Sequence, residues 1–74
     1  MLSERDIAVF DEYIDRFMSS DITIVKIKDE NYPSKFLRKA LQQRIKDRGM
    51  TNLIAYTFLS DLFLEKIYPL KNGS

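Results

Sequence analysis

Two carboxylates, Asp11 and Asp15, stand one helical turn apart and come nearest to the spacing of a metal site. A pair without further ligands holds a divalent cation poorly, so it fits the solvated acidic face of a helix better. The 74-residue sequence contains no histidine and no cysteine. These are the usual side chains for proton transfer, thiolate attack and zinc binding. We therefore expect no catalytic residues, no enzymatic activity, no bound metal or other cofactor, and no small-molecule substrate.

Positive charge is the other feature that could take part in binding. Residues 1–21 carry six acidic and two basic side chains, a net charge of −4. Residues 22–50 carry eight basic and three acidic side chains, a net charge of +5. The lysines and arginine at positions 35, 38, 39 and 46 could follow a phosphate backbone. The same division also fits pairing between opposite faces of this protein, or two helix surfaces that are simply solvated.

Two elements are expected in the first third of the sequence. Residues 3–18 form an amphipathic pattern, and Ser3 is a favourable N-cap. The apolar side chains recur at the spacing of one helical face: Ile7, Phe10, Ile14 and Phe17. Residues 22–27 follow a turn and are rich in β-branched side chains, which predicts a short strand.

A second helix is expected over residues 33–48. Pro33 suits the first turn of a helix, and Gly49 suits the left-handed position just past its end. The apolar face is made of Phe36, Leu37, Ala40, Leu41 and Ile45. Basic residues in the last turns favour the negative end of the helix dipole.

Residues 51–68 fit two structures. As a helix, the segment begins with Thr51 as N-cap and ends before Pro69, and we favour this alternative. As a hairpin, apolar residues alternate on both sides of Ser60-Asp61, which is a poor two-residue turn. The helix predicts an α+β, mostly helical fold with an N-terminal helix, a short strand and two helices. The hairpin predicts a helix-strand-helix-hairpin order with a three-stranded sheet.

The order of a strand, a basic helix, a glycine and a Thr-capped helix in residues 22–68 resembles the ribbon-helix-helix family of DNA-binding proteins. The resemblance is carried by Val25-Lys26-Ile27-Lys28-Asp29-Glu30 and by Gly49-Met50-Thr51. In that family the strands of two protomers pair into an antiparallel ribbon that enters the major groove. The helix at 3–18 and the long interval from Asp29 to Gly49 depart from the family's pattern.

The resemblance implies a small homodimeric transcriptional regulator that binds double-stranded DNA. The residues expected at the DNA are Ile24, Lys26, Lys28, Lys35, Thr51 and Asn52. Strand residues such as Lys26 would face the groove, and Thr51 with Asn52 would hold a phosphate at a helix N-terminus. A lone strand also needs a partner for its backbone groups, which favours a dimer.

The alternative is a protein-binding module, an inhibitor or adaptor that docks on a larger protein. Its contact surface would be the acidic face of the first helix, made of Asp11, Glu12 and Asp15. Exposed apolar side chains at Leu53, Ile54 and Leu64 offer a second possible surface. The hairpin structure favours this alternative, since a three-stranded sheet needs no dimer.

One small domain is expected over residues 1–69, followed by a flexible tail at 70–74. No signal peptide or membrane-spanning segment is visible in the sequence, which predicts a cytoplasmic protein without a membrane partner.

Overall fold

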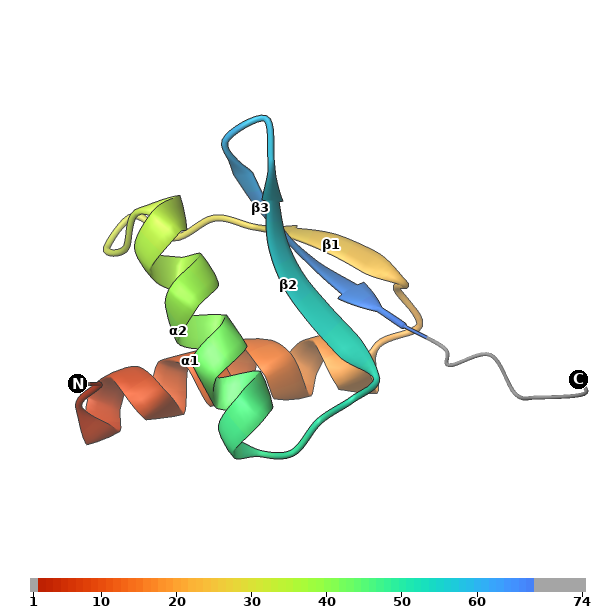
Figure 1. Cartoon of the computed structure of the whole chain (residues 1–74), viewed down its shortest axis with the longest axis horizontal. Helices are drawn as coiled ribbons and strands as arrows, with labels where there is room; N and C mark the ends of the chain where they lie inside the picture. Colours follow the sequence, from red (N-terminus) through yellow and green to blue (C-terminus); the bar gives the residue numbers. More distant parts are fainter. Residues whose placement is uncertain (1, 68–74) are drawn as a thin grey trace, which may run out of the picture.

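The structure, a computed structural model, describes residues 2–67 and has an α+β fold with two helices and three strands. The elements in chain order are α1 (Glu4–Ser19), β1 (Ile24–Ile27), α2 (Ser34–Asp47), β2 (Leu53–Phe58) and β3 (Asp61–Lys66). The three strands form one antiparallel sheet in the order β1-β3-β2 (Figure 1). The strand that comes last in sequence therefore lies in the middle of the sheet.

Helix α1 confirms the prediction for residues 3–18. The Ser3 hydroxyl accepts a hydrogen bond from the Asp6 amide at 3.1 Å, which caps the first turn. The predicted apolar face is the buried one, since Phe10, Ile14 and Phe17 all lie in the core. Burial of this stripe against the sheet and α2 holds the helix in place.

Strand β1 and helix α2 also confirm their predictions, with small differences at the ends. Pro33 is the N-cap of α2 rather than its first helical residue, and it offers no side-chain cap. Gly49 has φ of +65°, the left-handed conformation expected there. The amide of the next residue, Met50, then bonds the Ile45 carbonyl at 3.0 Å and closes the helix end.

The helix favoured for residues 51–68 is wrong, because the segment forms the hairpin β2–β3. Leu53 and Ala55 point into the core and Ile54 points out, which is the alternation of a strand. On a helix Ile54 and Leu64 would have fallen on the polar side. The helices contain 16 and 14 residues, so the chain is less helical than predicted.

The turn of this hairpin is Leu59-Ser60, one residue before the pair considered in the sequence. Both residues have positive φ, 51° and 70°, as the favoured two-residue hairpin turns require. Phe58 and Asp61 close the turn and set the register, which continues to Leu53 opposite Lys66. The turn geometry is thus ordinary, but its residue types are not the usual Asn-Gly.

One apolar core lies between the helices and the inner face of the sheet. Its fully buried large side chains are Phe10, Ile14, Leu37, Leu41, Leu62 and Leu64. No polar or charged side chain is buried among the described residues.

Two features on which the ribbon-helix-helix resemblance depended are absent from the part of the chain that the structure describes. Strand β1 pairs with β3 of the same chain, so it needs no second protomer to be stable. No helix begins at Thr51. The tail predicted at 70–74 lies outside the described residues. Among residues 2–67, neither helix is long and apolar enough to cross a membrane.

Candidate nucleic-acid interface

The acidic face predicted on α1 is largely occupied by arginines of α2. The guanidinium of Arg44 donates to both Asp11 oxygens, from Nε to Oδ1 at 2.9 Å and from Nη2 to Oδ2 at 3.2 Å. Arg48 donates from Nη2 to Oδ1 of Asp15 at 2.8 Å. The hydrogen bond that Arg44 donates to Asp11 is the main reason that the pKa of Arg44 lies above its usual value. These pairs hold the two helices together. They also occupy Asp11 and Asp15, the two carboxylates whose spacing came nearest to that of a metal site.

The remaining acidic residue of that predicted surface is Glu12, which forms no ion pair with the described residues. A partner-binding surface made of Asp11, Glu12 and Asp15 would first have to break the arginine pairs. Pairing between opposite faces of the protein thus explains part of the charge division in the sequence.

The basic side chains left over lie together on the exposed side of α2. They are Lys35, Arg38, Lys39 and Lys46, and none forms an ion pair within residues 2–67. The spacing of Lys35, Lys39 and Lys46 places them along the helix surface turned away from the core residues, whereas Arg38 lies at the flank of this surface and is partly buried. Between Ser34 and Lys46 the helix contains no acidic residue, so this surface carries four uncompensated positive charges. We call these four residues the α2 basic face.

Two glutamines lie beside the α2 basic face. Gln42 donates from Nε2 to the Ala55 carbonyl of β2 at 2.9 Å. Gln43 donates to Asp47, the first acidic residue of the helix, at 2.7 Å. Both side chains are exposed, so their remaining hydrogen-bonding groups are open to solvent.

The α2 basic face reaches the tip of the hairpin. Lys35 and Arg38 line a hollow of about 330 Å³ together with Ser34, Thr57 and Ser60. Three hydroxyl groups and two cations therefore meet where the hairpin turn lies against the first turns of α2. Of the residues predicted at DNA, Lys35 is the one that the structure places in this cluster.

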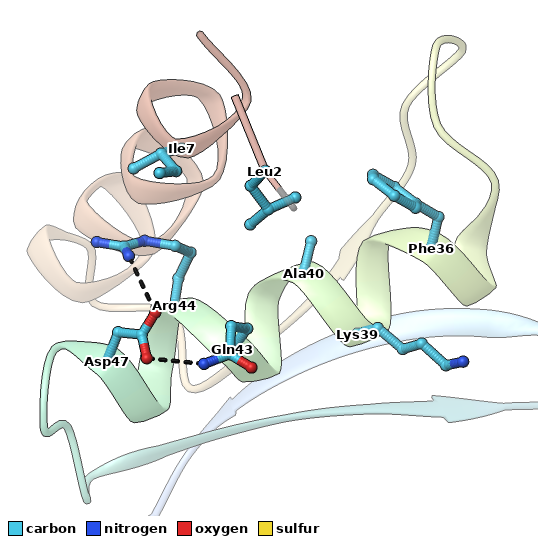
Figure 2. A pocket seen from close by; sticks show the side chains of 8 residues that line it. All are labelled: Leu2, Ile7, Phe36, Lys39, Ala40, Gln43, Arg44 and Asp47. Atoms are coloured by element: carbon cyan, nitrogen blue, oxygen red, sulfur yellow. Dashed lines mark hydrogen bonds and ion pairs between the residues drawn. The ribbon is translucent and has the colours of Figure 1, made fainter. Parts of the chain in front are cut away.

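A larger hollow, about 550 Å³, lies between the start of α1 and the side of α2. Figure 2 shows Leu2, Ile7 and Ala40 turned toward it, with Lys39 extending away along α2. Its polar rim is already paired, because Asp47 accepts hydrogen bonds from both Arg44 and Gln43. The hollow is thus mainly apolar, and of the charged residues that line it only Lys39 forms no ion pair within residues 2–67.

The other residues predicted at DNA are spread over different parts of the molecule. Ile24 and Lys26 lie on β1, where Lys26 approaches Asp61 at 4.0 Å. Thr51 and Asn52 precede β2, at the opposite end of the sheet from the hairpin tip (Figure 1). The Asn52 carbonyl accepts the Ile67 amide at 2.9 Å, which extends the ladder. The helix N-terminus that was expected to hold a phosphate at Thr51 and Asn52 does not exist, because these residues lead into a strand. Lys28 follows β1 and forms no ion pair within residues 2–67.

Tyrosine side chains join distant segments by donating to carboxylates. Tyr13 donates to Asp29 at 2.5 Å, and Tyr32 donates to Asp6 at 2.6 Å. The hydrogen bond to Asp29 raises the pKa of Tyr13 to about 12, and it lowers the pKa of Asp29. A third pair joins Tyr56 to Glu65 across the sheet at 2.8 Å. These hydrogen bonds tie each of the three tyrosines to another part of the fold.

Exposed apolar side chains gather on the sheet and its turn. They are Ile22, Ile24, Ile54, Phe58, Leu59 and Ile67. Leu59 at the hairpin tip is 81% exposed and Phe58 is 61% exposed. Of the three apolar residues predicted for partner binding, Ile54 is exposed, whereas Leu53 and Leu64 are buried in the core. The hairpin tip was missed because the sequence was interpreted as a helix there.

Comparison with known proteins identifies no relative: no protein-family model, no curated protein and no solved structure matches this chain.

Proposed function

We propose that this protein binds double-stranded DNA through the α2 basic face. The observation that supports the proposal is the distribution of unpaired charge. Arg44 and Arg48 are neutralised by α1, whereas Lys35, Lys39 and Lys46 lie along one side of α2 and form no ion pair within residues 2–67. A row of cations spaced along a helix matches the phosphates that border the major groove, which is wide enough to admit a helix.

The side chains between the cations have the chemistry of base recognition. Gln42 and Gln43 lie at the middle of the α2 basic face, and each keeps hydrogen-bonding groups exposed to solvent. A glutamine side chain pairs with adenine in the major groove, and a lysine pairs with guanine. The lysines at the two ends of the row would hold the phosphates on either side.

The hollow at the hairpin tip supplies a second contact in this proposal. Ser34, Thr57 and Ser60 provide hydroxyl donors beside Lys35 and Arg38. Hydroxyl and cationic side chains are the usual donors to phosphate oxygens, and such contacts fix the position of a protein on the duplex. Lys26 projects from the face of the sheet that points away from α2, so it takes no part in the same contact.

The test is the affinity for a mixed-sequence DNA duplex, measured by fluorescence anisotropy over a range of salt concentrations. Four phosphate contacts predict a slope of log K against log salt of about −3.6. In the double variant Lys39→Gln/Lys46→Gln the slope should become less negative by about 2. The matched control is Arg5→Gln/Arg16→Gln, which removes the same charge from α1 and should leave the slope close to that of the wild type.

Two results would refute the proposal. The first is an absence of DNA binding by the wild-type protein at low salt. The second is an equal loss in both double variants, which would mean that net charge alone attracts the duplex. A role in transcription would further require a preference for one DNA sequence, which selection from random duplexes would reveal.

A protein-binding function is the second candidate, and the exposed apolar side chains of the sheet support it. Ile54, Phe58 and Leu59 lie on or beside β2 and have no cover within residues 2–67. Such side chains are the anchors of protein interfaces when they lie close together. The variant Ile54→Ser/Phe58→Ser should keep its DNA affinity and lose retention of any partner found for the wild type.

A further inference from the structure

The two edge strands of the sheet differ in whether a side chain bonds their outward backbone groups. On the β2 edge, Gln42 reaches from α2 and bonds the outward carbonyl of Ala55 at 2.9 Å. The β1 edge receives no such cover from the described side chains. An open edge strand is a template on which another strand can add.

The register of the sheet determines which backbone groups β1 directs outward. Phe58 and Asp61 close a two-residue turn, so they exchange hydrogen bonds, and every second pair along β2 and β3 does the same. The bond from the Ile67 amide to the Asn52 carbonyl, at 2.9 Å, agrees with this alternation. Phe63 and Glu65 therefore direct their backbone groups toward β2.

The opposite set of β3 residues bonds β1. The Lys66 amide donates to the Thr23 carbonyl at 2.8 Å, which places Val25 in the next bonded pair. Ile24 and Lys26 lie opposite Glu65 and Phe63, so their amides and carbonyls point out of the sheet. Strand β1 thus offers two complete residues for pairing with another strand.

We infer that β1 pairs antiparallel with β1 of a second copy of this chain, with Val25 on the two-fold axis. Residues that face each other in this register are Ile24 with Lys26, and Ile22 with Lys28. A shift of the axis to Lys26 would place two lysines opposite each other, and a shift to Ile27 would pair Lys26 with Lys28. Like charges directly opposite are destabilising, so Val25 gives the longest pairing without them.

Charge and shape both fit a second copy. In this register Lys26 of one copy lies in the same row as Glu65 of the other, about 10 Å away, which is twice the spacing of strands. An extended lysine side chain crosses most of that distance toward the carboxylate, of which Oε1 already accepts the Tyr56 hydroxyl. Beneath the β1 edge, an apolar hollow of about 330 Å³ lies between Tyr13 and Phe17 of α1 and Val25 of β1. The inward side chains of an added β1 strand would lie over this hollow.

The resulting assembly is a continuous six-stranded sheet. A two-fold axis perpendicular to the sheet leaves both copies of α2 on the same side. The pairing stands independently of DNA binding, but it would present two α2 basic faces in one direction.

The test uses the absence of cysteine from the sequence. Val25→Cys introduces a single thiol, and opposite residues of a non-bonded antiparallel pair have Cα atoms about 4.5 Å apart, close enough for a disulfide. Under mild oxidation this variant should form a covalent dimer. Thr23→Cys is the matched control, because its two copies would lie about 13 Å apart at ~3.3 Å per residue and cannot bridge.

A second variant examines the hydrogen bonds. Lys26→Pro removes an amide that has no partner within one copy, so the fold should remain and the dimer should dissociate. Sedimentation equilibrium measures the mass, and circular dichroism checks the fold. The inference is overturned if the wild type is monomeric, or if Thr23→Cys cross-links as well as Val25→Cys. A dimer that persists in a folded Lys26→Pro variant would overturn it as well.

Discussion

The hairpin turn should be a place where stability can be gained. Leu59 and Ser60 both adopt the left-handed conformation, with φ of 51° and 70°. For a residue with a Cβ atom this conformation costs roughly 1–2 kcal/mol. Asn-Gly is the favoured pair for such a turn, because asparagine tolerates the conformation and glycine adopts it freely.

The expected magnitude follows from two opposing effects. Relief is complete at the glycine and only partial at the asparagine, which keeps its Cβ atom, so that it amounts to about 2–3 kcal/mol in all; the extra freedom of glycine in the unfolded chain removes about 0.4–1 kcal/mol of it. The side chain of Leu59 is 81% exposed, so little apolar burial is lost when it is replaced. The double variant Leu59→Asn/Ser60→Gly should therefore unfold with about 1–2 kcal/mol more free energy than the wild type.

Urea and thermal unfolding followed by circular dichroism measure this change. For a domain of this size each kcal/mol raises Tm by about 4–8 °C. The control is Leu59→Ala, which shortens the side chain but keeps the Cβ atom and hence the strained conformation. Equal stabilisation of the control, or no stabilisation of Leu59→Asn/Ser60→Gly, would show that the turn is not strained.

Three further changes have definite expected outcomes. Leu62→Ala empties a fully buried position in the central strand and should lower the free energy of unfolding by about 2–5 kcal/mol, measured in urea. Arg44→Gln leaves the partly buried Asp11 without its bidentate partner and should lower the free energy of unfolding by about 1–3 kcal/mol. A smaller loss than in an exposed control such as Arg5→Gln would contradict a stabilising role for the Arg44–Asp11 pair. The pKa of Tyr13 is raised to about 12 from an ordinary value of 10, so the unfolded chain loses this phenol proton at a lower pH than the folded chain. The free energy of unfolding should therefore fall as the pH rises from about 10 to 12. The variant Tyr13→Phe should show a smaller fall over the same pH range. The lowered pKa of Asp29 has the opposite sense, so its contribution is present above the ordinary aspartate pKa and is lost in acid.

Regular patterns in the sequence predicted the first three elements well. The spacing of Phe10, Ile14 and Phe17 is unambiguous for a helix, and Gly49 marked the end of the second helix correctly. The last segment failed because the turn Leu59-Ser60 lacks the residues that normally announce a hairpin. Ile54 favoured the hairpin, because it would lie outside the apolar side of a helix but fits the outer face of a strand.

The candidate site was only partly predictable. Lys35 and the other cations of α2 could be read from composition, because an amphipathic helix separates its charged side from its core side. That Arg44 and Arg48 pair with the carboxylates of α1 could not be predicted, because the pairing depends on how two helices far apart in sequence cross. The hydroxyl-lined hollow at the hairpin tip was equally hidden, since it joins α2 to a turn that the sequence did not reveal.

The central position of β3 in the sheet affects how the protein can fold during its synthesis on the ribosome. Strand β3 is the middle strand, and of the five elements it is synthesised last. Until Leu62 and Leu64 have left the exit tunnel, neither β1 nor β2 has a neighbouring strand to bond. The three-stranded sheet therefore cannot form during synthesis before this last strand is released, because both other strands bond to it and not to each other.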